Sequence, residues 1–285
     1  MLFISQAKHT FPNSKYVVLV NRNLFAGKWK IGGRAFQSST VLISPVQTFT
    51  NRFFTQAGAF VSKLLRLVAE KEKEGREGRK RRNFFNLSLC FVVQACLDSG
   101  FFYVINHGIS QEFMDEVFAQ SKRFFTLPLS EKMKHLRNEK HRGYTPVLDE
   151  VLDPENQVNG DYKEGYYIGV EVPEHDPKSE KPFYGPNVWP AAEDRLPEWR
   201  QTMEKFHQEA LEVAKAVARI IALALDLERD FFDKPEMLGN PIATLRLLHY
   251  EGGNQIEGQI SDPLKGIYGA GAHSDYGLIT LLANR

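Results

Sequence analysis

Apolar residues recur every three or four positions between residue 197 and about residue 227, which is the spacing of one face of an α-helix. A second helical pattern covers residues 110–125, where Ser110 stands in the position of an N-cap that accepts a backbone hydrogen bond. We therefore expect two amphipathic helices whose apolar stripes are buried. The stripe of the longer helix consists of Met203, Phe206, Ala210, Val213, Val217, Ile220 and Ala224.

Three short segments have the aromatic, β-branched or continuously apolar character of strands: residues 101–106, 244–250 and 278–282. Residues 141–192 are rich in Gly, Pro, Tyr and Asp, which indicates loops with short strands. Within them, Lys163 and Glu164 are expected to form a solvated turn. A short helix is expected after Pro128, with Ser130 as its cap. The mixture of helices and strands predicts an α+β protein.

One pair of residues has the spacing of metal ligands. His273 and Asp275 are two positions apart, so on a β-strand both side chains would point to one face. An imidazole and a carboxylate side by side are two members of the 2-His-1-carboxylate triad that holds non-haem Fe(II). Gly and Ala residues precede the pair and Gly277 follows it, which leaves room around a metal ion. Spacing alone also allows a strand histidine that is merely hydrogen-bonded.

Two other pairs have the same His-x-carboxylate spacing. His207 and Glu209 lie in the long helical pattern, where positions i and i+2 point apart and cannot bind one ion. His249 and Glu251 could share a strand, so they form a rival site.

Composition excludes several classes of protein. The 285 residues are 42% hydrophobic, enough to bury a core in one large domain or two small ones. The only two cysteines, Cys90 and Cys96, argue against a disulfide framework and suit a reducing compartment. The longest apolar candidate, residues 84–97, is too short to span a membrane and contains polar residues.

Charge is distributed unevenly along the chain, although the formal net charge is only +1. Residues 1–82 hold 16 Lys+Arg and 4 Asp+Glu, a balance of +12, which leaves 20 of the 36 basic and 31 of the 35 acidic residues, a balance of −11, for residues 83–285. The larger part is therefore acidic and offers no surface expected to bind nucleic acid.

We leave residues 1–93 unassigned to any domain, because three explanations of this basic segment stay open. The first is a gene-model artefact, since residues 83–94 are what a pyrimidine-rich intron end could encode. The second is an organelle transit peptide, since the segment before Glu70 is free of acidic residues. The third is a disordered basic arm. A cytoplasmic protein is expected, or an imported one if residues 1–82 are a transit peptide.

Several separate motifs occur in one order along the rest of the chain. They are DSGFFYVINHGI at 98–109, RGY at 142–144, GDYKEGYYIG at 160–169, TLRLLHY at 244–250 and HSDYGLITLL at 273–282. This set resembles the Fe(II)/2-oxoglutarate oxygenases of the isopenicillin N synthase-like type, which include plant gibberellin oxidases, flavonoid oxygenases and aminocyclopropane-carboxylate oxidase. The resemblance runs from about residue 94 to residue 283. It identifies residues 94–230 with the family's N-terminal region and residues 231–285 with the start of its jelly roll.

The resemblance implies a double-stranded β-helix, a jelly roll of two facing sheets, preceded by a region of helices and strands. In the family the second metal-binding His, and the Arg that holds the far carboxylate of 2-oxoglutarate, come later in the chain. Neither has a counterpart among the residues up to 285. We therefore expect a barrel that is incomplete and truncated in this chain, with the strand at 278–282 lacking its later partners.

The resemblance also implies a chemistry. The protein would be an oxidoreductase that hydroxylates or desaturates a small organic molecule, with Fe(II) as cofactor and 2-oxoglutarate and O2 as co-substrates. His273 and Asp275 would be metal ligands, Tyr250 a 2-oxoglutarate contact and Tyr144 a substrate contact. A monomer without nucleic-acid or membrane partners is expected. The missing His and Arg imply that this chain is inactive, and the alternative is a non-catalytic remnant or a weak metal-binding or interaction module.

Overall fold

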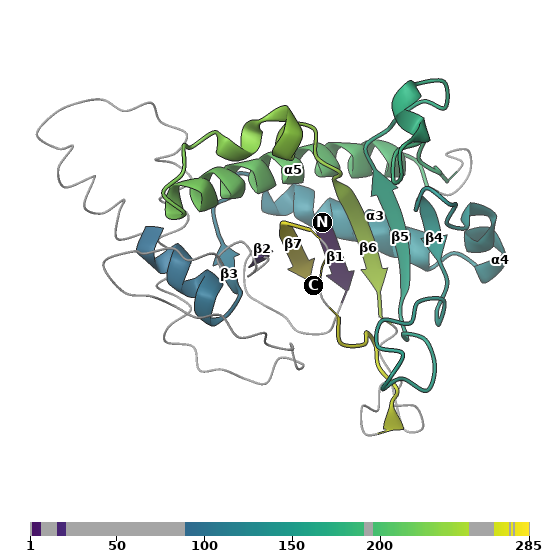
Figure 1. The fold of residues 1–285 in the computed structure, drawn as a ribbon. Coiled ribbons are helices and arrows are strands. Elements are labelled where there is room, and N and C mark those ends of the chain that lie inside the picture. Colours follow the sequence, from purple (N-terminus) through teal and green to yellow (C-terminus); the bar gives the residue numbers. More distant parts are fainter. Residues whose placement is uncertain are drawn as a thin grey trace, which may run out of the picture.

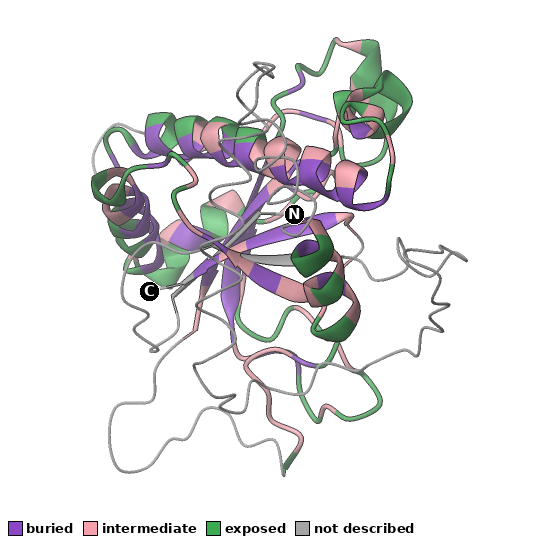
Figure 2. Cartoon of the chain, turned by 90° about the vertical axis from the view of Figure 1, so that its left-hand side faces the viewer, coloured by how far each residue is buried: buried purple, intermediate pink, exposed green. Residues whose placement is uncertain are grey.

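Two long helices lie across one face of an open seven-stranded sheet in the computed structural model (Figure 1). The structure describes residues 2–6, 16–20, 89–190, 196–250, 265–273, 275 and 277–284. Helix α3 is Gln111–Phe125 and helix α5 is Trp199–Ala224. Their buried residues face inward and their exposed residues face outward (Figure 2).

Both long helices are confirmed, because short-range signals define them. Ser110 is the N-cap of α3, and its hydroxyl accepts a 3.2 Å hydrogen bond from the Phe113 backbone N–H. Every member of the apolar stripe expected for α5 is buried. The expected cap at Ser130 is wrong, because helix α4, Leu129–Lys132, begins after Pro128 and contains Ser130. Residues 89–98 also form a helix. This helix includes residue 93, at which the unassigned segment was expected to end.

Seven strands form the sheet in the order β3-β2-β7-β1-β6-β5-β4. The strands are β1 Leu2–Gln6, β2 Tyr16–Val20, β3 Phe101–Val104, β4 Gly143–Thr145, β5 Glu164–Gly169, β6 Thr244–His249 and β7 Ile279–Asn284. All three expected strand segments are therefore confirmed as β3, β6 and β7. Short helical turns occupy Met133–His135, Pro177–Glu180, Phe231–Asp233 and Pro235–Gly239.

Strand β7 is paired along both edges. Strand β1 runs parallel to it, with Leu2 opposite Leu281, and β2 runs antiparallel, with Val18 opposite Leu281. Without its later partners, the strand at 278–282 was expected to leave an open edge; this expectation is wrong, because two strands from the first twenty residues lie beside it. The basic run at residues 79–82 and most of the segment 1–93 lie outside the described residues.

Strands β5 and β6 separate two environments. Their antiparallel register sets Tyr166 opposite Leu247, and both side chains belong to the core that the helices cover. Because side chains alternate along a strand, Tyr167 and its partner Arg246 point to the other side of the sheet. Polar groups can therefore gather on that side without disturbing the helical layer.

The α+β class is confirmed, and the described strands form an open sheet rather than a closed barrel, as expected for an incomplete jelly roll. None of the helices described in this structure is both long enough and apolar enough to cross a lipid bilayer.

Candidate metal centre

His273 and Asp275 face each other just before strand β7. His273 Nε2 lies 3.5 Å from Asp275 Oδ1, so the two atoms that would bind a metal ion converge. The pair lies in the segment that leads into the strand and not on the strand itself, because β7 begins only at Ile279. The two side chains are 39% and 21% exposed, so an ion can reach them from solvent.

A second partner orients each of the two side chains. His273 Nδ1 lies 2.8 Å from the Gly271 carbonyl oxygen, which can only accept, so Nδ1 carries the proton and the neutral ring has its lone pair on Nε2. The Thr280 hydroxyl, on β7, donates a 2.7 Å hydrogen bond to Asp275 Oδ2. These contacts leave Nε2 and Oδ1 available, as in metal sites where outer partners fix the ligands.

The two groups also shift one another's protonation. The contact with Asp275, together with the Gly271 carbonyl, raises the pKa of His273 in spite of its partial burial. Burial alone would raise the pKa of Asp275, but His273 and Thr280 outweigh it and hold the pKa below its usual value. A positive charge is thus favoured between the two groups, and a bound cation would take the place of the proton.

The donor set fits Fe(II) at two of the three positions of a facial triad. One imidazole nitrogen and one carboxylate oxygen are the ligand types that a non-haem iron site needs. Within the described ranges, no third His, Cys, Asp or Glu joins His273 and Asp275 in a group that could hold an ion. The rival His249 is engaged elsewhere, since its Nδ1 lies 2.8 Å from Glu164 Oε1 and its ring stacks on Phe125. Its expected partner Glu251 lies outside the described residues.

Tyr250 lies beside the segment that leads to His273. It directly follows β6, and an added Cβ on Gly269 would come within 3.2 Å of its ring. A glycine at 269 therefore lets the two chain segments approach closely. Burial raises the pKa of Tyr250 to about 12, so the hydroxyl stays protonated near neutral pH and can donate a hydrogen bond.

Tyr144 belongs to a buried cluster around Glu164 on the helix-covered side of the sheet. It is 1% exposed, and its hydroxyl donates a 2.5 Å hydrogen bond to Glu164 Oε2. The Lys132 ammonium lies 2.7 Å from the same oxygen, and His249 contacts the other one. Burial alone would raise the pKa of Glu164, but these three partners outweigh it and lower the pKa.

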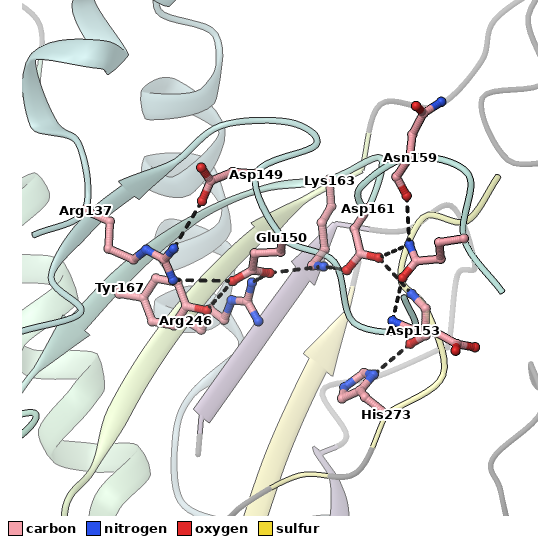
Figure 3. A network of polar contacts seen from close by, with 12 residues as sticks. Arg137, Asp149, Glu150, Asp153, Asn159, Asp161, Lys163, Tyr167, Arg246 and His273 are labelled. Atoms are coloured by element: carbon pink, nitrogen blue, oxygen red, sulfur yellow. Dashed lines mark hydrogen bonds and ion pairs between the residues drawn. The ribbon is translucent and has the colours of Figure 1, made fainter. Parts of the chain in front are cut away.

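A second buried network lies on the other side of β5 (Figure 3). The carboxylate of Glu150 forms ion pairs with Arg246 on β6 and with Lys163, and it accepts a 2.6 Å hydrogen bond from the Tyr167 hydroxyl. Lys163 also forms an ion pair with Asp161. Burial alone would raise the pKa of Glu150, but Arg246, Tyr167 and Lys163 together lower it to about 2.

The expectation of a solvated turn at Lys163 and Glu164 is wrong. Lys163 is 4% exposed and Glu164 is 5% exposed, and each side chain forms an ion pair with an opposite charge. The available signal was alternation across the GDYKEGYYIG motif, in which Glu164, Tyr166 and Ile168 share one face. Sequence reasoning also missed Glu150 and Asp161, because their partners are far away in the chain and no local pattern marks them.

Residues 82–192 match the family described as the N-terminal region of a non-haem dioxygenase in morphine synthesis. The azadirone synthase LFS of Melia azedarach is 50% identical over 196 residues, which are 69% of this chain and 57% of that protein. The 2-oxoglutarate-Fe(II) type oxidoreductase hxnY of Emericella nidulans is 37% identical over 201 residues, which are 67% of this chain and 53% of that protein. The chain thus spans little more than half the length of these curated relatives.

Among solved structures, a full-length Neurospora crassa protein in complex with alpha-KG and thymine has a TM-score of 0.49 and 28% sequence identity. The match covers 59% of this chain and 51% of that chain. The family relationship rests on the sequence matches.

Proposed function

Since the chain belongs to the 2-oxoglutarate- and Fe(II)-dependent dioxygenases, we propose that its function is the oxidation of a small organic molecule at a site that includes His273 and Asp275. The observation that carries this proposal is the 3.5 Å approach of His273 Nε2 to Asp275 Oδ1, with the opposite atom of each side chain already held by Gly271 or Thr280. When bound together, Fe(II), 2-oxoglutarate and O2 supply the oxidising chemistry, with succinate and CO2 as by-products.

The chain's own residues would bind and orient these groups. His273 would offer Nε2 and Asp275 would offer Oδ1 to the metal, while the Gly271 carbonyl keeps the proton on Nδ1. The Tyr250 hydroxyl would donate a hydrogen bond to 2-oxoglutarate. Two observations support this role: burial raises the pKa of Tyr250 to about 12, and its ring lies beside Gly269 in the segment that leads to His273. Hydroxylation or desaturation of the substrate would follow, as in the resembled family.

A substrate contact at Tyr144 would compete with a contact inside the protein. Its ring is 1% exposed and its hydroxyl is used by Glu164. A direct contact would require the hydroxyl to leave a buried carboxylate. The arrangement therefore favours an indirect role in which Tyr144 helps to hold the strands together.

The test of the proposal is the turnover of 2-oxoglutarate by the purified chain. Succinate is measured with Fe(II), ascorbate and O2 present, for the wild type, Asp275→Ala and His175→Ala. His175 is an exposed histidine outside the segment that holds the pair, so its loss should be neutral. Succinate formation that needs Fe(II) and Asp275, but not His175, supports the proposal. Succinate formation that survives Asp275→Ala contradicts it.

A second candidate function is metal binding without turnover. The observation that favours it is the absence of a third metal-binding side chain near His273 and Asp275 in the described part of the chain. This candidate predicts that the wild type binds Mn(II) but forms no succinate at any concentration of Fe(II). Any Asp275-dependent succinate excludes it.

A monomer in a reducing compartment is the proposed state of the protein. Both cysteines, the exposed Cys90 and the buried Cys96, are free. Burial raises the pKa of the Cys96 thiol to about 12, so this thiol stays protonated and unreactive. Light scattering of the purified chain measures the oligomeric state, and a stable dimer would contradict the proposal.

A further inference from the structure

We propose that Asp161 is a positioning residue that acts through Gly271 to orient the ring of His273. The inference rests on the proposed function, since it concerns the role of His273 as a metal ligand. It assigns a purpose to a buried carboxylate that is 110 positions away from the residue whose backbone it binds.

Asp161 is fully buried and uses both of its carboxylate oxygens. Oδ1 accepts a 2.9 Å hydrogen bond from the Gly271 backbone N–H and a 2.7 Å hydrogen bond from Gln157 Nε2. Oδ2 forms an ion pair with Lys163. A carboxylate that accepts such charge-assisted bonds holds its donors more tightly than a neutral acceptor would.

The backbone of Asp161 is fixed as well. Its N–H donates a 2.6 Å hydrogen bond to the Glu150 carbonyl oxygen, and its own carbonyl accepts one of 3.0 Å from the Leu148 N–H. The Lys163 ammonium forms ion pairs with both Asp161 and Glu150, so the buried carboxylate of Asp161 has a counter-charge beside it. The carboxylate is therefore held in one place from both the main chain and the side chain.

Gly271 links this network to the candidate metal centre. Its N–H binds Asp161, and its carbonyl oxygen lies 2.8 Å from His273 Nδ1 (Figure 3). A Cβ at this position would clash with Gln157 Oε1 and would lie 2.9 Å from Asp153, so only glycine fits without a shift. A single residue thus receives the bond from Asp161 and makes the bond to His273.

Two further contacts hold the same two segments side by side. The Val158 N–H donates to the Gly266 carbonyl oxygen at 3.1 Å, and the Tyr162 N–H donates to the Tyr268 carbonyl oxygen at 2.9 Å. These backbone bonds fix residues 266–268 but do not reach His273. Of these three bonds, the Asp161 bond reaches furthest toward the histidine, and it holds the amide of the same residue whose carbonyl contacts His273.

The consequence is a defined tautomer. The Gly271 carbonyl lies 2.8 Å from Nδ1, within normal hydrogen-bond distance, whereas Asp275 Oδ1 lies 3.5 Å from Nε2, so the geometry favours the proton of the neutral ring on Nδ1 and the lone pair on Nε2. Without the Asp161 carboxylate, the carbonyl can shift and the ring can rotate or exchange tautomers. The histidine would then offer its lone pair to a metal ion only part of the time.

The test compares Asp161→Asn with Asp149→Asn, a matched change in the same loop. Asp149 forms an ion pair with Arg137 and is 43% exposed, so its loss controls for a missing negative charge. The first readout is the pair of ¹⁵N side-chain shifts of His273 in the metal-free protein at alkaline pH, assigned with His273→Ala. The second is the dissociation constant for Mn(II).

We expect the wild type and Asp149→Asn to show the Nδ1–H tautomer of His273. In Asp161→Asn the shifts should move toward a mixture of the two tautomers, and the Mn(II) dissociation constant should rise by about tenfold, as for other changes to outer partners of metal ligands. Unchanged His273 shifts in a folded Asp161→Asn protein overturn the proposal. If Asp161→Asn fails to fold, Gly271→Ala displaces the same carbonyl without a change of charge, and wild-type shifts there overturn the proposal equally.

The two readouts also separate this inference from the proposed function. If the wild type binds no Mn(II), the metal site is wrong, while the tautomer shifts still decide the role of Asp161. If the wild type binds Mn(II) through His273 but Asp161→Asn leaves the shifts unchanged, the metal site stands and the positioning role is wrong.

Discussion

Lys163 and Glu164 are neighbours in the chain, yet their charged groups belong to two separate buried networks on opposite sides of β5. The Lys163 ammonium pairs with Asp161 and Glu150, whereas the Glu164 carboxylate pairs with Lys132. The alternation of side chains along an extended chain explains this arrangement. One network supports the segment of the candidate metal centre, and the other ties β4, β5 and β6 to helix α4.

The first prediction concerns the Glu164 cluster. Glu164→Gln leaves the Lys132 ammonium, whose side chain is only 11% exposed, without a counter-charge. Loss of one partner of a buried ion pair should lower the free energy of unfolding by about 3 kcal/mol or more. Urea unfolding followed by circular dichroism measures the difference.

Glu131→Gln is the control for this prediction. Glu131 pairs with Lys134 at the surface, where both side chains are more than a third exposed, so its loss should cost about 0.5 kcal/mol or less. Equal effects of the two substitutions would show that the Glu164 cluster is no more stabilising than a surface pair.

The second prediction concerns acid. The folded protein holds the pKa of Glu150 at about 2, against an ordinary value of 4.5. Because the pKa is lowered by folding, the contribution to stability is complete above about pH 4.5 and is lost as the pH falls toward 2, by about 3 kcal/mol in total. In Glu150→Gln, the decline of the unfolding free energy over this range should be smaller by that amount. If the unfolding free energies of the wild type and Glu150→Gln fall equally between pH 4.5 and pH 2, this prediction is wrong.

The third prediction concerns 2-oxoglutarate. Tyr250→Phe removes one neutral hydroxyl, so the dissociation constant of 2-oxoglutarate on the Mn(II)-loaded protein should rise by about tenfold. Calorimetry provides the measurement, with Tyr184→Phe as the control for the loss of a hydroxyl elsewhere. Affinity for Mn(II) itself should be unchanged. Wild-type affinity for 2-oxoglutarate in Tyr250→Phe would remove this residue from the site.

The fourth prediction concerns the N-terminal segment. Deletion of residues 1–20 removes β1 and β2, which are the strands paired with β7. A strand with open edges is a template for aggregation, so the shortened chain should be less soluble and should lose cooperative unfolding. A deletion that leaves solubility and melting unchanged would support the explanation that residues 1–93 are a gene-model artefact.

Local signals in the sequence predicted much of the described fold. The stripe from Met203 to Ala224 defines α5, and Ser110 defines the start of α3, because both depend on residues within one or two turns. The neighbours of β7 could not be predicted in this way. Pairing with Leu2 and Val18 joins positions more than 250 residues apart, and a parallel or antiparallel partner leaves no mark on the local pattern.

In the candidate site too, the features with a local signal could be predicted and those that depend on distant residues could not. His273 and Asp275 were found from their spacing and from the motif around them, and the structure brings the two side chains together. The network behind them, from Asp161 to Gly271, depends on a hydrogen bond across 110 positions. Charged residues such as Asp161 are almost always solvated, so burial of this one could be recognised only from the folded structure.

His273 and Asp275 are proposed to bind one divalent metal ion together. The most direct measurement is an anaerobic Mn(II) titration, followed by electron paramagnetic resonance, of the wild type, His273→Ala, Asp275→Ala and His175→Ala. One bound ion is expected in the wild type and in His175→Ala, and no binding in the other two variants. Binding that survives both His273→Ala and Asp275→Ala, or that is lost in His249→Ala with His273 intact, would contradict it.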